Sequence, residues 1–250
     1  MSEVAVSVKG LGKDYIDASG QITLGCKNLS FEARYGEIFG LLGTNGAGKT
    51  TTLRILSTVL KPTSGDAFIA GNSVTRSPER VRQAIGFLSA STGLYGRLSA
   101  AEMLRYFGRL HNLTEEEVER RILEISDALD MSDFLDRRCD KLSSGQRQRV
   151  SIARTIIHDP TVLILDEATT GLDILAAAQI VKFIKQSRDK GKCVILSTHI
   201  MHEAEQLCDR IVIIHQGQVK AHGTIEELRN HFQQDNLDHI FMRALDVELL

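Results

Sequence analysis

The chain has 250 residues, of which 42% are hydrophobic and 25% charged, and its formal net charge is −2. This composition is typical of a soluble globular protein with one large domain or a core with an inserted lobe. The near-neutral charge disfavours a nucleic-acid-binding protein.

Membrane and export signals are missing from the same sequence. Its apolar runs span five or six residues, whereas a membrane helix needs about twenty. The first ten residues lack the apolar segment of a signal peptide. Four cysteines stand at unrelated spacings, which indicates reduced core residues of a cytosolic protein. We therefore expect a chain that does not cross a membrane by itself.

The first forty or so residues contain three strand patterns, VAVSVKGL, KNLSFEA and GEIFGLLG. The third is apolar without alternation, so we expect it to be buried on both faces. It runs into GTNGAGKT, which matches the pattern G-x-x-x-x-G-K-S/T, and a helix, TTLRILSTVL, begins inside the match. A strand before the loop and a helix after it favour a phosphate-binding loop over a chance glycine-rich turn.

In such a loop, glycines let the backbone wrap around phosphates without Cβ clashes. Lys49 would supply positive charge to the β- and γ-phosphates, and the Thr50 hydroxyl would reach Mg²⁺. The residues expected to bind the nucleotide here are Gly43, Thr44, Asn45, Gly46, Ala47, Gly48, Lys49, Thr50 and Thr51.

Helical patterns follow from about Tyr95 to Ile157. Ser99-x-x-Glu102 and Thr114-x-x-Glu117 fit capping boxes at two helix starts. A third helix begins within KLSSGQRQRVSIA, residues 141–153. Its first turn carries Ser143, Ser144, Gly145 and Gln146, and we expect uncovered backbone N–H groups there to form a second anion site. The arginines farther along, Arg147, Arg149 and Arg154, are expected to form a solvated or salt-bridged helix face.

Strand patterns return as TVLILD, KCVILST and DRIVIIHQGQVKAHG, the last with a hairpin turn at Gln216-Gly217. Asp166 ends the first of these strands, where it is expected to hold Mg²⁺ through water or from the second sphere, and Glu167 would polarise an attacking water. His199 follows the second strand. Adjacent acids are usually just solvated, and a lone histidine is usually packed or on the surface. However, parallel strands end at one edge of a sheet, which favours His199 contacting the γ-phosphate and holding Glu167.

The order of these elements predicts an α/β fold, a P-loop NTPase core with a mostly parallel sheet. An antiparallel β subdomain would precede it, and a helical lobe would be inserted at about residues 90–157. A further capping box, Thr224-x-x-Glu227, opens an expected short helical tail over residues 226–250.

These motifs, in this order, resemble those of the ATP-binding cassette (ABC) ATPases over about residues 4–225. GTNGAGKT is similar to their Walker A loop, LSSGQ to their signature, LILDE to Walker B, GLD (ending at Asp173) to the D-loop, and STH to the switch histidine. KDY at residues 13–15 resembles the stretch with the aromatic that stacks on adenine, which nominates Tyr15. The alternative is that Tyr15 is an ordinary aromatic residue at the end of a strand.

The resemblance implies that two copies dimerise head to tail around two ATP molecules, each with Mg²⁺. The signature residues Ser143, Ser144, Gly145 and Gln146 of one copy would then contact the γ-phosphate of the ATP bound by the other. This arrangement explains why one chain has two anion sites. Asp173 would link the two sites, and Ser144 stands where the family usually has glycine.

A cassette without a membrane span resembles the ATPase subunit of a transporter whose membrane permease is a separate protein. GLYGRLSAAEMLRYFGRL and NLDHIFMRAL are similar to segments of bacterial exporters, including the sodium-extruding type. The resemblance implies a cytoplasmic protein bound to the inner face of the cell membrane, with no nucleic-acid partner. The alternative is a soluble ABC ATPase of translation or DNA repair, although those usually have two cassettes or a long coiled coil. A GTP-binding switch is disfavoured because no N-K-x-D run occurs, and a non-hydrolysing module is disfavoured by Glu167 and His199.

One position departs from the family pattern. Where the family usually has a glutamine that senses Mg²⁺ and the permease, this chain has Ala90. Our hypothesis is that a water ordered by Ser89, Ser91 or Thr92 replaces the missing side chain.

Overall fold

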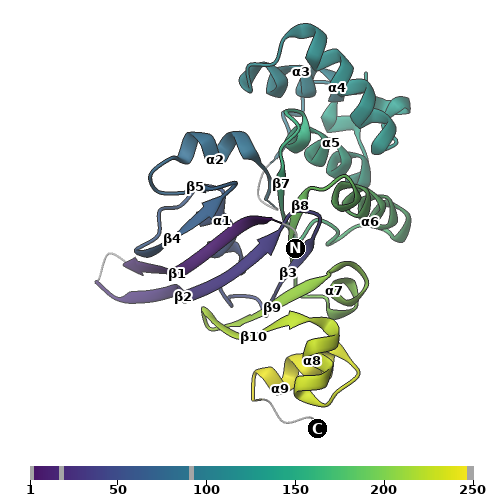
Figure 1. Cartoon of the computed structure of the whole chain (residues 1–250). Helices are drawn as coiled ribbons and strands as arrows, with labels where there is room; N and C mark the ends of the chain where they lie inside the picture. The colour runs from purple at the N-terminus through teal and green to yellow at the C-terminus, as the bar shows by residue number, and fades with distance from the viewer. Residues whose placement is uncertain (1–2, 17–19, 90–92, 247–250) are drawn as a thin grey trace.

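The computed structural model describes residues 3–16, 20–89 and 93–246 (Figure 1). Its largest sheet has six strands in the order β10-β9-β3-β8-β7-β6. The five strands from β9 to β6 run parallel, and β10 pairs antiparallel with β9 at one edge. The strands are β3 (Ile38–Leu42), β6 (Ile85–Leu88), β7 (Val162–Asp166), β8 (Cys193–Thr198), β9 (Arg210–His215) and β10 (Gln218–Thr224).

A second, antiparallel sheet has the order β2-β1-β4-β5. Its strands are β1 (Val4–Ile16), β2 (Ile22–Arg34), β4 (Ser64–Ile69) and β5 (Asn72–Ser73). The sequence predicted the first two strands, but not the β4–β5 hairpin that completes this sheet. The mostly parallel core and the antiparallel sheet agree with the predicted fold class.

The central strands are buried on both faces, as the runs without alternation predicted. Phe39 and Leu41 of β3 pack toward the antiparallel sheet, whereas Ile38 and Leu42 belong to the cluster on the opposite face. The four cysteines are free and buried, as predicted: Cys26, Cys139, Cys193 and Cys208.

The phosphate-binding loop leads into α1 (Lys49–Leu56), which is shorter than the predicted run to Leu60. The helix stops because Thr58 adopts a left-handed conformation with φ 62°. The amides of Val59 and Leu60 then both donate to the carbonyl of Arg54, which closes the helix end. Helix α2 (Pro78–Ala84) follows between β5 and β6.

Three helices form the lobe at one end of the molecule: α3 (Ala100–Leu110), α4 (Glu115–Ala128) and α5 (Ser144–Ile156) (Figure 1). Two short 3₁₀ turns, η1 (Ser132–Phe134) and η2 (Cys139–Lys141), lie between α4 and α5. Both predicted capping boxes are present, because Ser99 and Thr114 accept from the amides of Glu102 and Glu117. Residues 90–92, including Ala90, Ser91 and Thr92, lie outside the described part of the chain.

The arginine face predicted on α5 is only partly as expected. Arg149 forms an ion pair with Asp130, at 3.3 Å. The prediction of a solvated or salt-bridged side chain is wrong for Arg154, which is buried. Its guanidinium lies 5.3 Å from the ring centroid of Phe107 and donates to the carbonyl of Gly93 at 2.9 Å. The aromatic face of Phe107 and the carbonyl of Gly93 are thus two of the groups that contact this buried cation.

The remaining helices are α6 (Ile174–Asp189), α7 (Met201–Leu207), α8 (Ile225–Phe232) and α9 (Leu237–Ala244). The Thr224 capping box opens α8, as predicted. Leu228 of α8 and Ile240 of α9 belong to the same buried cluster as Ile38 of β3. Helix α8 packs against β10, and α9 packs against α7 and α8. Within residues 3–16, 20–89 and 93–246, no helix has the length and apolar character needed to cross a membrane.

Candidate active site

The loop from Gly43 to Thr50 connects β3 to α1 and surrounds a buried ammonium group. The Nζ atom of Lys49 donates to the carbonyl oxygens of Gly43, at 2.7 Å, and Thr44, at 3.1 Å. Burial lowers the pKa of Lys49, and the negative charges of Glu167 and Asp166 oppose that shift. The amine is thus oriented by the loop's own backbone and lies in the field of two carboxylates.

The loop has no space for a side chain at Gly48, where it enters α1. Gly48 has φ 105°, and a Cβ added there would lie 2.4 Å from the carbonyl oxygen of Gly25. The loop therefore packs directly on the backbone of β2, with no space for a methyl group.

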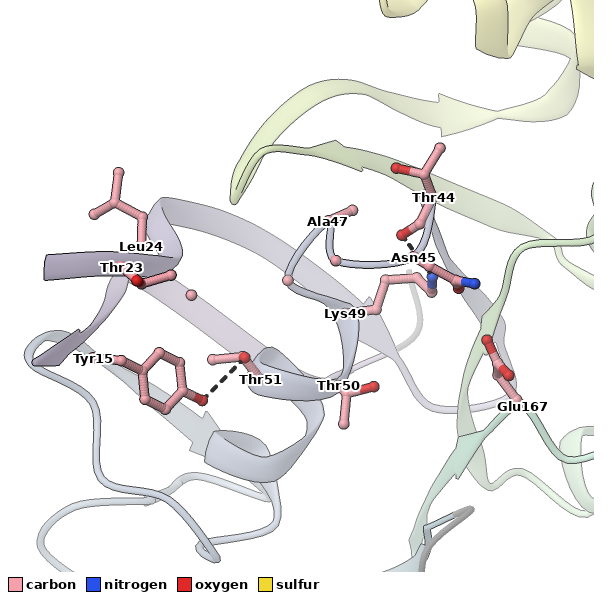
Figure 2. A pocket seen from close by; sticks show the side chains of 13 residues that line it. Tyr15, Thr23, Leu24, Thr44, Asn45, Ala47, Lys49, Thr50, Thr51 and Glu167 are labelled. Atoms are coloured by element: carbon pink, nitrogen blue, oxygen red, sulfur yellow. Dashed lines mark hydrogen bonds between the residues drawn. The ribbon is translucent and has the colours of Figure 1, made fainter. Parts of the chain in front are cut away.

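An open pocket lies over this loop (Figure 2). Thr44, Asn45, Gly46, Ala47, Gly48, Lys49, Thr50 and Thr51 line it from the loop and α1. Tyr15 lines it from β1, with its hydroxyl 3.2 Å from the hydroxyl of Thr51, and Glu167 lines its opposite side.

Three lining residues were not predicted from the sequence: Thr23, Leu24 and Gly25 of β2. Tyr15 is paired with Thr23 in the β1–β2 ladder. The register of that ladder places β2 beside the pocket, and the ladder contains several irregularities. The sequence carried no signal for these residues, because only the strand pairing brings Leu24, which is half exposed, close to Tyr15.

Two acidic residues follow one another at the end of β7. The Asp166 side chain is buried and accepts a hydrogen bond from the Ser197 hydroxyl of the neighbouring strand. Glu167 has φ 51°, an unusual value for a residue with a side chain. Its amide donates to the carbonyl of Ser197 at 3.2 Å, so β8 fixes the position of both acids.

His199 follows β8 and lies against Glu167. The Nδ1 atom of His199 is 2.9 Å from Oε1 of Glu167, and both side chains remain partly exposed. The histidine and the carboxylate thus form one hydrogen-bonded pair at the carboxyl edge of the parallel sheet.

The signature residues lie at the start of α5, and none of them is among the described residues that line this pocket. Ser143 accepts from the Gln146 amide at 3.2 Å, and the Gln146 side chain accepts from the Ser143 amide at 3.0 Å. The expectation that this first turn is uncovered is therefore wrong for the Gln146 amide, because a capping box satisfies it. The amides of Ser144 and Gly145 still have no acceptor within the helix, since they belong to its first turn.

The segment after Glu167 connects the signature helix to α6. The side-chain amide of Gln148 donates to the carbonyl of Ala168 at 2.6 Å. Asp173 is the N-cap of α6 and accepts from the Ala176 amide at 2.9 Å. A Cβ added to Gly145 would lie 2.8 Å from the Cβ of Ala176, so this glycine allows close contact between α5 and α6.

A family model described as "ABC transporter" matches residues 26–170, more than half of the chain. The chain belongs to the ABC transporter family.

Relatives and solved structures agree with this assignment of an ABC ATPase. The chain is 41% identical to the ABC transporter ATP-binding protein NatA of Bacillus subtilis, over 88% of this chain and 89% of the relative. It is 35% identical to the daunorubicin resistance ATP-binding protein DrrA3 of Streptomyces coeruleorubidus, over 98% and 76%. The solved structure of an ATP-binding subunit of an ABC transporter superposes with a TM-score of 0.86 at 31% identity, covering 96% of this chain and 99% of that one.

A second solved structure is the dimeric post-hydrolysis state of the ATP-binding cassette MJ0796, bound to ADP and Pi. Its TM-score is 0.79 at 27% identity, over 88% of this chain and 98% of that one. These findings confirm the predicted family and fold class, and the chain is an ATP hydrolase.

The oxygen-bearing side chains near the phosphate-binding loop also suit a Mg²⁺ ion bound together with ATP. Among the described residues, no cluster of three or more His, Cys, Asp or Glu side chains is placed to hold a metal. Thr50 has an exposed side chain at the start of α1, and Asp166 is held at the end of β7. Mg²⁺ commonly uses one or two protein ligands together with substrate phosphates and waters, and this sparse set of oxygens suits that mode.

Proposed function

We propose that this chain is the ATP-hydrolysing subunit of a bacterial ABC exporter, acting as a homodimer on a separate integral membrane permease. The observation that carries the proposal is the Glu167–His199 pair, with Nδ1 and Oε1 2.9 Å apart, on strands that end beside the phosphate-binding loop. A carboxylate in this place can accept a proton from the water that attacks the γ-phosphate.

Lys49 and Tyr15 of the pocket, and His199 beside Glu167, each have a distinct task in this proposal. Lys49 exchanges its two carbonyl partners for phosphate oxygens, since a charged acceptor makes the stronger hydrogen bond. Tyr15 offers its ring to the adenine base. His199 holds Glu167 and contacts the γ-phosphate.

Mg²⁺ would be held by Thr50 and by Asp166, directly or through water, where it would neutralise developing charge on the phosphate oxygens. Ser197 donates to Asp166 and thereby keeps that carboxylate oriented.

The place of the signature supports dimerisation. Ser143 and Ser144 are exposed at the start of α5 and do not line the pocket of their own chain. We propose that Ser143, Ser144, Gly145 and Gln146 contact the ATP of a second copy, with Asp173 nearby linking the two sites. The MJ0796 structure, a dimer bound to ADP and Pi, supports dimerisation of such a cassette.

The exporter assignment rests on relatives. DrrA3 is named for daunorubicin resistance and another relative for Nod factor export. Sodium as the cargo is proposed from the resemblance of GLYGRLSAAEMLRYFGRL and NLDHIFMRAL to segments of the sodium-extruding exporters. In this proposal the chain lies on the cytoplasmic face of the membrane, bound through its permease. The same relatives disfavour a soluble ATPase of translation or DNA repair.

Glu167→Gln tests the proposal. Phosphate release should fall at least about a hundredfold, the contribution of a positioned general base, while ATP binding persists. Gel filtration with Mg²⁺ and ATP should then show a stable dimer for the variant, and a monomer when ATP is omitted.

Glu205→Gln is the control. Glu205 of α7 forms an ion pair with Arg229 of α8, and it does not line the pocket. A Glu167→Gln protein that binds ATP yet stays monomeric at high concentration would contradict the composite site. Recovery of the tagged chain with ribosomes or DNA, and not with membranes, would favour the soluble alternative.

A further inference from the structure

Glu203 of α7 is hydrogen-bonded to both loops that carry the hydrolytic pair. The Thr169 hydroxyl donates to one carboxylate oxygen of Glu203, and the Thr198 hydroxyl donates to the other at 2.6 Å. Both bonds use a charged acceptor, which makes them stronger than bonds between neutral groups. A single side chain thus connects the segment after β7 to the end of β8.

The two threonines adjoin the residues of the proposed reaction. Thr169 lies two positions after Glu167, and Thr198 directly precedes His199. The Thr198 hydroxyl also accepts from the amide of Ile200 at 3.0 Å, so the backbone on both sides of His199 is held by this hydroxyl.

The backbone of Glu167 needs such support. Its φ of 51° is a conformation that costs a side-chain-bearing residue free energy and persists only where surrounding contacts enforce it. The amide of Glu167 is held by Ser197 on one side, and Glu203 holds the chain two residues farther on.

We propose that Glu203 is a positioning residue for ATP hydrolysis, which fixes Glu167 and His199 at hydrogen-bonding distance by tying together the loops that carry them. This inference rests on the proposed function, in which Glu167 polarises the attacking water. Glu203 does not line the nucleotide pocket, so it acts on the rate of the chemical step and not on ATP affinity.

Glu203→Gln is the sharpest variant, because it keeps the size of the side chain. The carboxylate of Glu203 accepts from both hydroxyls, whereas glutamine has one oxygen to accept and an amide nitrogen that can only donate. One threonine hydroxyl must therefore turn to accept from that nitrogen, and both bonds lose their charged acceptor. We expect kcat for ATP to fall about tenfold or more, which corresponds to about 1.4 kcal/mol in the barrier, with KM for ATP changed less than about twofold.

A double-mutant cycle separates this role from general stabilisation of α7. Thr169→Val removes the hydroxyl from the other end of one bond. If Glu203 acts through Thr169, the losses in kcat of Glu203→Gln and Thr169→Val should be clearly less than additive in the double variant. Glu205→Gln, on the same helix and paired with Arg229 of α8, should leave kcat unchanged.

Three outcomes would overturn the inference: a parental kcat in Glu203→Gln, fully additive losses in the cycle, or the same loss of kcat in Glu205→Gln. Glu167→Gln is measured beside them. If that variant loses hydrolysis and Glu203→Gln does not, only the positioning role fails. If Glu167→Gln still hydrolyses ATP at the parental rate, the proposed function itself fails.

Discussion

Lys49 is a buried cation whose described hydrogen-bond acceptors, the carbonyls of Gly43 and Thr44, belong to the loop itself. Water is largely excluded, since the residue is 5% exposed. The loop is thereby shaped around a positive charge before any phosphate arrives. Pre-orientation of this kind reduces the cost of ordering the site when ATP binds.

Lys49→Ala should therefore abolish ATP hydrolysis and the rise in melting temperature that ATP produces in the parent protein. The phosphate clamp contributes on the order of 3 kcal/mol or more to the reaction, and a ligand that no longer binds cannot stabilise the fold. Thermal melts with and without ATP, together with phosphate release, check both effects. Lys61→Ala, which removes an exposed lysine, is the control. A normal ATP-induced rise in Lys49→Ala would exclude this loop as the phosphate site.

Single site residues could be predicted from the sequence where neighbouring residues along the chain define the chemistry. The loop residues from Gly43 to Thr51 could be predicted because their spacing alone defines a phosphate site. Leu24 could not, because its place depends on pairing between two strands. Glu203 could not either, because Thr169 is 34 residues away along the chain and only the fold brings them together.

Among the elements, the β9–β10 hairpin supports the phosphate-binding loop. At its turn, the amide of Gly217 donates to the carbonyl of Ala47 at 2.9 Å, and the carbonyl of Gly217 accepts from the amide of Lys27 at 2.7 Å. The turn residues have φ 48° and 74°. One glycine therefore connects the loop to β2.

Gly217→Ala should weaken ATP binding. Its Cβ would lie 3.0 Å from the Cα of Cys26 in β2, so the turn must shift relative to β2, and the hydrogen bond from Gly217 to Ala47 of the loop should weaken. A matched control exists, because Ala70 and Gly71 have nearly the same φ values, 48° and 76°, and a Cβ on Gly71 would meet nothing within 4 Å.

Both alanine variants should lose about 1–2 kcal/mol of folding stability from the left-handed conformation. Only Gly217→Ala should raise KM for ATP, by several-fold. Steady-state kinetics and urea unfolding of the two proteins measure these quantities. Equal values of KM in both variants would show that the hairpin does not support the loop.

The hairpin turn itself was predictable from Gln216-Gly217, as were the capping boxes opened by Ser99, Thr114 and Thr224. In each case, residues within four positions determine the structure. The end of α1 at Leu56 was not predictable, because the first glycine or proline after it is Pro62 and threonine rarely adopts the left-handed conformation that Thr58 has here.

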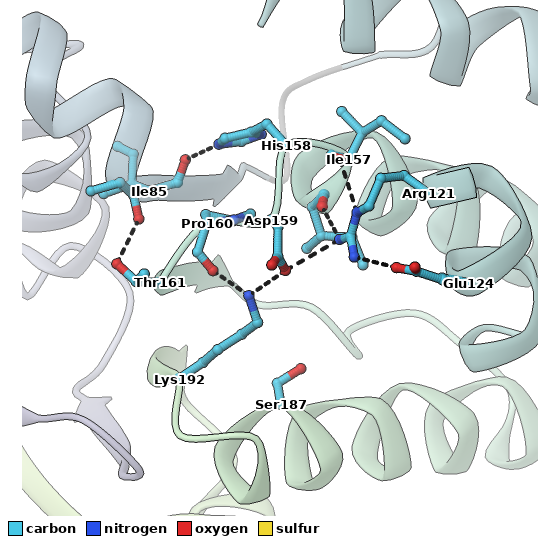
Figure 3. A network of polar contacts seen from close by, with 12 residues as sticks. Ile85, Arg121, Glu124, Ile157, His158, Asp159, Pro160, Thr161, Ser187 and Lys192 are labelled. Atoms are coloured by element: carbon cyan, nitrogen blue, oxygen red, sulfur yellow. Dashed lines mark hydrogen bonds and ion pairs between the residues drawn. The ribbon is translucent and has the colours of Figure 1, made fainter. Parts of the chain in front are cut away.

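At the scale of the whole molecule, the lobe joins the core through the turn between α5 and β7 (Figure 3). Arg121 of α4 donates to the carbonyls of Ile156, at 2.9 Å, and Ile157, at 3.2 Å. Asp159 forms ion pairs with both Arg121 and Lys192, at 3.3 and 2.8 Å, and Lys192 directly precedes β8. Arg121 of the lobe and Lys192 of the core therefore both contact the turn that connects α5 to β7.

A histidine in this turn makes the fold sensitive to acid. His158 stacks on His111 with ring centroids 3.6 Å apart, and its Nε2 lies 2.9 Å from the carbonyl oxygen of Ile85. Burial lowers the pKa of His158 to about 4, and the charges of His111, Lys192 and Arg121 add to the shift. The unfolded chain, with an ordinary histidine pKa near 6.5, thus binds a proton that the folded chain does not.

The free energy of unfolding should therefore decrease as pH falls below about 6.5, and this decrease should level off near pH 4. His158 accounts for a loss on the order of 2 kcal/mol between pH 7 and pH 5. His158→Gln should remove that part of the pH dependence, as measured by urea unfolding at the two pH values. An unchanged difference between pH 7 and pH 5 in the variant would assign the acid sensitivity to other groups.

The turn at His158 also lies in the middle of a continuous stretch of chain. The signature opens α5 at Ser143, the helix ends at Ile156 where Arg121 holds its last carbonyls, and β7 continues to Asp166 and Glu167. In the proposed dimer, one continuous helix–turn–strand unit thus begins at the phosphate of one ATP and ends at the water that attacks the other. The two nucleotides are then mechanically coupled ligands, because a shift of this unit when one ATP is hydrolysed also changes the contacts of the other nucleotide.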